Sequence, residues 1–143
     1  MSLEYAKYIV IGTLAITVII KVMTSAKQMR QISDSNPESE ELVNDFEGKA
    51  LFGSSANISG SEFNGSLEFM VNENEFLVRS FIPPLFETRF QLSKLHGRRK
   101  RSLFFTYVYL TYDDDPTLEI RISEKLAKQI HDKSGANWSY ENV

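Results

Sequence analysis

The chain of 143 residues contains no cysteine, only two histidines and only seven glycines. Without cysteine, a small secreted domain stapled by disulfides is excluded. His96 and His131 lie far apart and have no cysteine or glutamate at metal-ligand spacing. So few histidines allow no Ser-His-Asp order, and the glycines form no phosphate-binding loop. We therefore expect a protein that is not an enzyme, with no catalytic residue, no metal site and no cofactor.

The chain also lacks an excess of basic charge. Sixteen lysines and arginines stand against nineteen aspartates and glutamates, and the net charge of −3 argues against general nucleic-acid binding. Aromatic residues, in contrast, make up 12% of the chain and lie mostly after residue 45. They indicate a packed core of one modest domain in the remaining hundred or so residues.

Charge is absent from residues 9–20, within the apolar segment YAKYIVIGTLAITVIIKVM of residues 5–23. At ~1.5 Å per residue this segment would extend roughly 28 Å, close to the hydrocarbon thickness of a bilayer. Lys7 and Lys21 lie near its ends, where their long stems let the ammonium groups reach the headgroups. The pattern predicts a transmembrane helix in residues 1–24.

A signal peptide cleaved after Ala26 is the main alternative, because Lys7 precedes an apolar core and small residues precede the cut. Glu4 and Lys21 argue against it, since they interrupt the basic start and the apolar end. In that case the protein would be a secreted or periplasmic β domain. A buried core helix is the third hypothesis, but a uniformly apolar surface fits lipid better.

The basic residues beside the segment predict its orientation. Lys7 stands on the N-terminal side, and Lys21, Lys27 and Arg30 stand on the C-terminal side. The positive-inside rule therefore places the short N-terminus outside and the body in the cytoplasm.

Residues 25–48 read as an acidic juxtamembrane linker, in which Asn36 and Pro37 would begin a short helix. From residue 49 the apolar pattern changes to a period of two, as in strands. Residues 72–74 would form a hairpin turn and residues 96–101 a loop. Residues 103–112 are apolar on both faces, so we expect a central strand buried on both sides rather than an open face for a partner. The expected strands are residues 50–58, 66–71, 75–82, 86–92, 103–112 and 117–122.

Ser123 would cap a C-terminal helix that buries Leu126, Ala127 and Ile130 and ends at Gly135. The predicted fold class is therefore α+β: a transmembrane helix, then an antiparallel β partial barrel closed by a helix. The β domain would span residues 49–134, and residues 135–143 would form a tail. This shape resembles the pleckstrin-homology-like superfold.

Residues 52–86, FGSSANISGSEFNGSLEFMVNENEFLVRSFIPPLF, resemble a family of uncharacterised short bacterial proteins with one membrane helix and such a domain. The likeness rests on the serine-containing strand, the aromatic-x-Gly turn at 63–65, the hairpin and Pro-Pro-Leu, and covers about a third of the chain. After Phe86 the family continues with an aliphatic-Pro-Trp, whereas Glu87-Thr88-Arg89-Phe90 stands here. The resemblance implies a bacterial inner-membrane setting, but no reaction and no functional residues.

The only dense charge cluster is basic and includes Lys94, Arg98, Arg99, Lys100 and Arg101. Near an anionic leaflet each cation would contribute ~1 kcal/mol of binding. These five cations are therefore candidates for contact with anionic lipid headgroups or an acidic protein partner. The alternative is a solvated loop, or a gatekeeper for the apolar strand that follows.

The run Asp113-Asp114-Asp115 lacks the alternating ligands and the glycine of a calcium loop, so an acidic hairpin turn is expected there. Taken together, these patterns predict a non-enzymatic binding or scaffolding module at the cytoplasmic face of a bacterial inner membrane.

Overall fold

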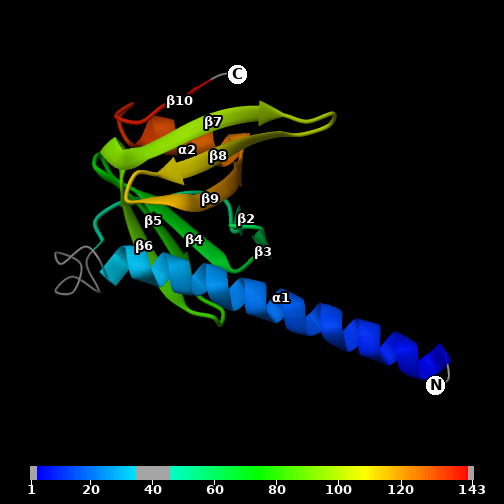
Figure 1. Ribbon diagram of the computed structural model, residues 1–143. Coiled ribbons are helices and arrows are strands. Elements are labelled where there is room, and N and C mark those ends of the chain that lie inside the picture. The colour runs from blue at the N-terminus through cyan, green and yellow to red at the C-terminus, as the bar shows by residue number, and fades with distance from the viewer. Residues whose placement is uncertain (1–2, 35–45, 142–143) are drawn as a thin grey trace.

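The structure is a computed structural model that describes residues 3–34 and 46–141. Its body consists of two β-sheets and a C-terminal helix, and a long N-terminal helix leaves the body on one side (Figure 1). The α+β class is thus confirmed. Where one curled sheet was expected there are two, because the short 3-10 helix η2 (Leu92–Lys94) turns the chain from one sheet into the other.

The first sheet has the order β1-β4-β5-β6, and all its pairings are antiparallel. The expected hairpin is confirmed: β4 and β5 pair from Leu67↔Ser80 to Val71↔Phe76. Its turn is closed by the Asn72 side chain, whose Oδ1 accepts hydrogen bonds from the backbone N–H groups of Asn74 and Glu75. The four strands are β1 (Lys49–Ala50), β4 (Leu67–Val71), β5 (Glu75–Ser80) and β6 (Phe86–Gln91).

The second sheet has the order β10-β7-β8-β9-β2-β3, in which only the β10–β7 pair is parallel. The weak strand expected at residues 50–58 is instead divided between β1 and β2, and β2 forms a hairpin with β3. Ser59 and Gly60 take positive φ values of 48° and 88° in the tight turn of this hairpin. The strands are β2 (Ala56–Ile58), β3 (Ser61–Phe63), β7 (Leu95–Arg101), β8 (Thr106–Tyr112), β9 (Asp115–Ser123) and β10 (Tyr140–Glu141).

The core lies between the sheets and is rich in aromatic rings. Phe76 stacks on Phe69 and Phe90, and Tyr112 meets Phe90 edge-on with the centroids 5.0 Å apart. Buried residues of β4 and β9 alternate with less buried ones, as in strands that bury one face. Many of the aromatic residues after residue 45 therefore lie in this core.

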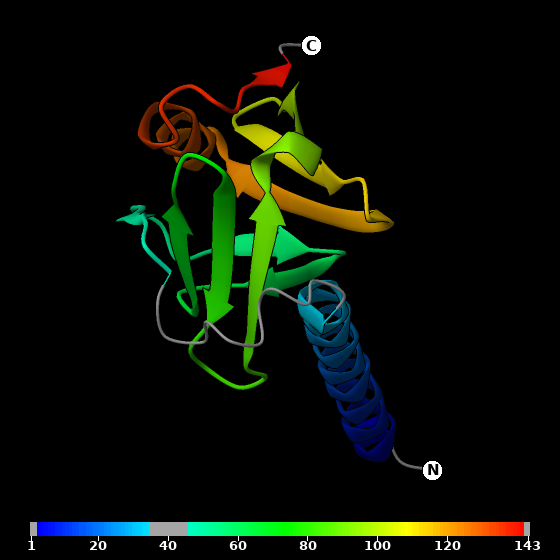
Figure 2. The same ribbon diagram turned by 90° about the vertical axis from the view of Figure 1, so that its left-hand side faces the viewer.

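The C-terminal helix α2 (Glu124–Lys133) is confirmed as predicted. Ser123 Oγ accepts a hydrogen bond from the Leu126 N–H, and Leu126, Ala127 and Ile130 are buried. Gly135 follows with φ +70°. Figure 2 shows α2 at the end of the body away from the free part of the long helix.

The segment expected as a C-terminal tail packs against the body up to Glu141, the last residue that the structure describes. Trp138 is buried, its indole N–H donates to the Leu95 carbonyl at 2.8 Å, and β10 extends the sheet beside β7. A side chain at Gly97 would place its Cβ 2.7 Å from the Trp138 ring, so a glycine is needed here. The tryptophan thus belongs to the domain core.

Two expectations about the β7–β8 hairpin were wrong. Residues 96–101 are part of strand β7 and not a loop, because they pair along their whole length with β8. The turn comes later: the Ser102 N–H donates to the Phe105 carbonyl at 2.7 Å, so residues 103–105 lie outside the strand. In addition, β8 is central but buries only one face.

The long helix α1 (Leu3–Asp34) is continuous and has two different surroundings. Its N-terminal part is exposed and is long and apolar enough to cross a membrane, although a signal sequence would share these properties. From Ser25 onward it packs against β3 and β6 of the body. Part of the expected linker is therefore a docked helix, and the helix expected from Asn36–Pro37 lies outside the described residues.

Candidate functional site

Strand β7 carries most of the basic cluster, and the alternation of a strand divides it between two faces. His96, Arg98 and Lys100 point to the outer face of the second sheet, while Arg99 and Arg101 point to the face that carries α2. The cluster is therefore a basic strand and not one patch.

Two of the five predicted cations are held by acidic residues of the body. Lys94 Nζ lies 3.0 Å from Asp114 Oδ2, and this hydrogen bond raises the pKa of Lys94 despite the opposing effect of desolvation. Arg99 Nε lies 2.9 Å from Glu124 Oε1 of α2, an ion pair without hydrogen-bond alignment. These two residues stabilise the hairpin and the position of α2.

The other three cations remain available. The Lys100 ammonium lies 5.7 Å from the ring centroid of Tyr109, a weak cation–π contact. Within the described chain, Arg98 and Arg101 form no ion pair or side-chain hydrogen bond. Arg98, Lys100 and Arg101 are all exposed and approach the tip of the hairpin.

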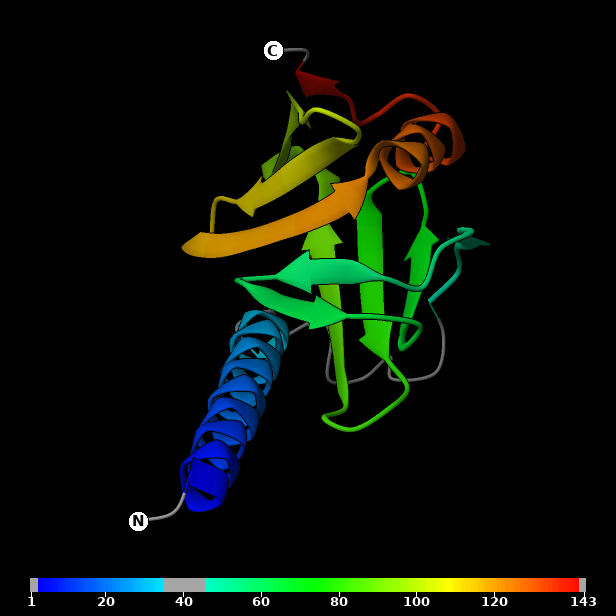
Figure 3. The same ribbon diagram turned by 90° about the vertical axis from the view of Figure 1, so that its right-hand side faces the viewer.

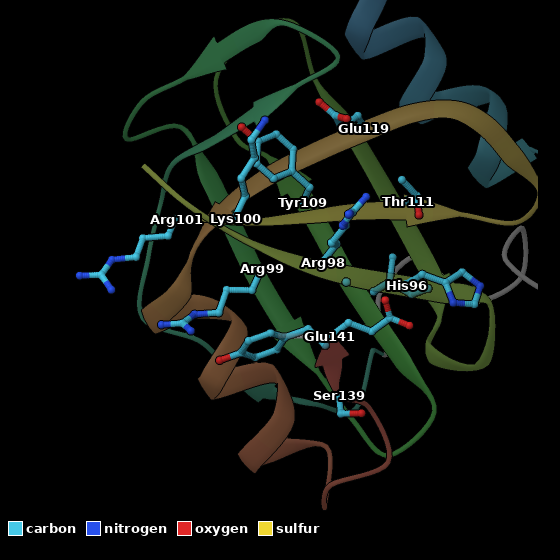
Figure 4. Close-up of a pocket in the computed structure, with 13 residues that line it drawn as sticks. His96, Arg98, Arg99, Lys100, Arg101, Tyr109, Thr111, Glu119, Ser139 and Glu141 are labelled. Atoms are coloured by element: carbon cyan, nitrogen blue, oxygen red, sulfur yellow. The ribbon is translucent and has the colours of Figure 1, made fainter. Parts of the chain in front are cut away.

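The outer face of the second sheet is hollowed beside β7 (Figure 4). The hollow has a volume of about 1130 Å³ and is bounded by β7, by β8 and by the docked C-terminal segment. Arg98 and Tyr109 are cross-strand partners at its centre, and Arg101 is directed away from it. Glu119 and Glu141 also line it, so its charge is mixed. An open, mixed hollow of this kind suits contact with a surface better than enclosure of a small molecule.

The tip of the β7–β8 hairpin was missed by the sequence patterns. Leu103, Phe104 and Phe105 are 86%, 82% and 63% exposed, although they were expected inside a buried strand. The sequence carries no signal that separates them from a strand, because a short run of consecutive apolar residues also occurs in strands that are buried on both faces.

A second apolar loop joins β5 to β6. Phe81, Ile82 and Leu85 are each about half exposed. The loop lies beside α1, because the Arg30 guanidinium donates two hydrogen bonds to the Leu85 carbonyl, at 2.6 and 2.8 Å.

The acidic run at residues 113–115 forms the β8–β9 turn and the start of β9, and each carboxylate has its own partner. Asp113 Oδ1 lies 2.8 Å from His96 Nε2, and Asp114 pairs with Lys94. Burial opposes ionisation of Asp115, but hydrogen bonds from Thr117 and Gln28 outweigh it and lower the pKa. The described residues contain no group of three side chains that could hold a metal ion.

The geometry therefore offers cations, exposed apolar tips and a long apolar helix, but no assembled set of acid, base and nucleophile in the described residues. Comparisons with protein-family models, with curated proteins and with solved structures found no match to this chain.

Proposed function

We propose that α1 crosses a bacterial inner membrane once and that the β body is a non-enzymatic binding or scaffolding module at its cytoplasmic face. The body would be a pleckstrin-homology-like domain, supported by its succession of antiparallel strands and a final helix. It would act through contacts with anionic headgroups or with a protein partner.

The observation that carries this proposal is the change of surroundings along α1. Almost all side chains of residues 3–23 are exposed, whereas Ala26, Met29 and Ile32 belong to the core of the body. An apolar helix surface of this length is stable only in a solvent such as lipid. The docked second part makes the helix a structural piece of the domain.

The same observation weighs against release by cleavage after Ala26. Ala26 lies near the start of the docked part of α1 and is almost fully buried, so cleavage after it would cut the helix where it joins the body. Cleavage would also remove Ser25, whose hydroxyl donates to the Ile58 carbonyl at 2.9 Å. A secreted or periplasmic domain remains the competing proposal, and it requires the loss of these contacts.

The mass of the mature chain and its resistance to alkaline carbonate test the anchor. We expect the full-length mass and retention in the membrane pellet. A mass reduced by the first 26 residues, or release of the intact chain by carbonate, would refute the proposal.

Orientation is measured with single cysteines, because the natural chain has none. Glu73→Cys lies on an exposed turn of the body and Glu4→Cys near the start of α1. In intact cells a membrane-impermeant maleimide should label the cysteine at position 4 and not the one at position 73. The reverse pattern would place the body outside.

The basic strand is tested through the single tryptophan, Trp138, which packs against β7. In nanodiscs containing the full chain, energy transfer from Trp138 to a dansyl headgroup lipid should rise with the anionic lipid fraction. Removing two free cations in R98S/R101S should abolish this rise. The matched variant K125S/K128S, which removes two exposed cations from α2, should keep it; equal behaviour of both variants would exclude a role for the strand.

A further inference from the structure

The body exposes large apolar side chains at two loop tips. Leu103, Phe104 and Phe105 form the tip of the β7–β8 hairpin, and Phe81, Ile82 and Leu85 lie in the β5–β6 loop. None of these six side chains belongs to the buried core between the sheets. A soluble surface tolerates scattered apolar residues, but six at two tips mark a contact surface.

Both tips face the side on which α1 leaves the body. Figure 1 shows the β7–β8 hairpin and the N-terminal part of α1 extending toward the same side. In Figure 3, which looks from that side, the β5–β6 loop also projects in the direction taken by the helix. The hydrogen bonds from Arg30 to the Leu85 carbonyl join this second loop to α1 directly.

The body stands next to the proposed membrane boundary, without a spacer. Residues 3–23 would extend about 30 Å, the thickness of the hydrocarbon layer, so that layer ends near Met23. Val22 already packs against the core of the body, and Ser25 and Ala26 are buried in it. Any loop that projects from the body toward the N-terminus of α1 therefore reaches the headgroup layer.

The charges around the hairpin tip match such a surface. The sequence from Arg98 to Phe105 is RRKRSLFF, with four cations, three apolar residues and no acidic residue. Arg98 and Arg101 have no ionic partner among the described residues. Apolar side chains at the depth of the acyl chains with cations behind them at the depth of the phosphates are the usual arrangement of interfacial membrane segments.

We infer that the tips of the β7–β8 hairpin and of the β5–β6 loop insert into the leaflet from which α1 emerges. The body would then rest on the bilayer at three points, α1 and the two tips. This fixes its orientation and leaves α2 and the β4–β5 turn facing away from lipid. The inference depends on the proposed membrane anchor and adds to it a defined lipid-contacting surface.

The test uses the full chain in proteoliposomes, with single cysteines labelled with an environment-sensitive fluorophore. Phe104→Cys and Ile82→Cys report the two tips. Glu73→Cys is the matched control, since it lies on the turn at the opposite end of β5 from the β5–β6 loop (Figure 2). An unchanged Trp138 emission shows that each labelled protein is folded.

Labels at positions 104 and 82 should be quenched strongly by nitroxides attached to the acyl chains and weakly by aqueous iodide, and the label at position 73 should behave oppositely. Depth analysis should place the two tips ~5–10 Å into the headgroup and acyl boundary, the depth of interfacial segments. Equal iodide quenching at positions 104 and 73 would overturn the inference.

Two further outcomes distinguish failure of the tip insertion from failure of the anchor. Protection of position 104 from both quenchers would mean that a protein, such as a second copy of the chain, covers the tip, and this also overturns the inference. If carbonate releases the chain, the anchor itself fails. If the chain stays in the membrane pellet but aqueous iodide quenches the labels at both tips, the anchor stands and only the insertion of the tips is refuted.

Discussion

The two parts of α1 have the same secondary structure and opposite surroundings. Residues 3–23 present apolar side chains to the outside, and residues 25–32 bury theirs against β3 and β6. No proline or break separates them. The difference shows that helix formation does not decide what a helix contacts; the side chains along it do.

Small and polar residues allow the second part to dock. Ser25 and Ala26 let the helix approach the β2–β3 hairpin, where Ser25 Oγ donates to the Ile58 carbonyl. On the other side the buried Thr88 hydroxyl donates to the Met29 carbonyl at 2.7 Å. Among the described residues the first part has no such partners, and its Thr13 and Thr17 hydroxyls donate to carbonyls of their own helix instead.

The largest effect is expected from Met29→Ala. Met29 is fully buried, so its truncation leaves a cavity and should lower the free energy of unfolding by ~2–5 kcal/mol. Ile16→Ala in the first part should change it by less than ~0.5 kcal/mol, as exposed substitutions do. Urea unfolding in detergent micelles, followed by Trp138 fluorescence, measures both. Equal losses of unfolding free energy would show that the two parts of α1 do not differ in their packing against the body.

The second effect concerns the membrane. A lysine at position 16 would lie near the centre of the span and cost ~2.5–3.5 kcal/mol on insertion. Ile16→Lys should therefore lower the fraction of chain that resists carbonate, without changing urea unfolding of the body. In Met23→Lys the stem reaches the headgroups, so retention should stay close to that of the natural chain. If the membrane pellet fully retained both variants, the first part of α1 would not be surrounded by lipid.

A smaller effect is expected from Ser25→Ala. This change removes the buried hydroxyl that is hydrogen-bonded to the Ile58 carbonyl and the Ser61 hydroxyl, which costs ~1–3 kcal/mol. Thr24→Ala is the control one residue earlier, because the Thr24 hydroxyl donates only to the Ile20 carbonyl of its own helix. The comparison is made by urea unfolding, and a larger loss for Thr24→Ala would mean that α1 does not dock as described.

The smallest effect is on pH dependence. Asp115 accepts a hydrogen bond from Gln28 at 2.9 Å and has a lowered pKa in the folded protein. Its stabilising contribution is therefore complete above the ordinary value of 3.8 and is lost as the pH falls through the lower folded value. The urea midpoint of the natural chain should decrease across this window more than that of Asp115→Asn. Parallel pH profiles would show that stability does not depend on ionisation of the Asp115 carboxylate, which accepts hydrogen bonds from Thr117 and Gln28.

The helices and most strands were predictable because their signals are local. The apolar run, the cap at Ser123 and the alternation in residues 67–71 each report on neighbouring residues only. The basic cluster could also be recognised in the sequence. Its division into paired and unpaired cations could not. Lys94 and Arg99 are neutralised by Asp114 and Glu124, which lie twenty or more residues later in the chain.

The apolar tips could not be located from the sequence, since a run of apolar residues in a strand and in a turn look alike. Their position depends on where the β7–β8 ladder ends, at the Arg101↔Thr106 pair. The docked tail was missed for a related reason: Trp138 finds its place only because Gly97, far away in sequence, leaves room for its ring.

The sequence by itself determined a long apolar helix, an α+β body and a basic segment, because periodicity, capping and composition act over a few residues. The tertiary structure alone decided that α1 is docked from Ser25 onward, which cations remain unpaired among the described residues, and that two apolar tips face the side on which the apolar part of α1 leaves the body. These features depend on contacts between residues far apart in the chain, whose pairing is set by packing and by sheet register rather than by local pattern.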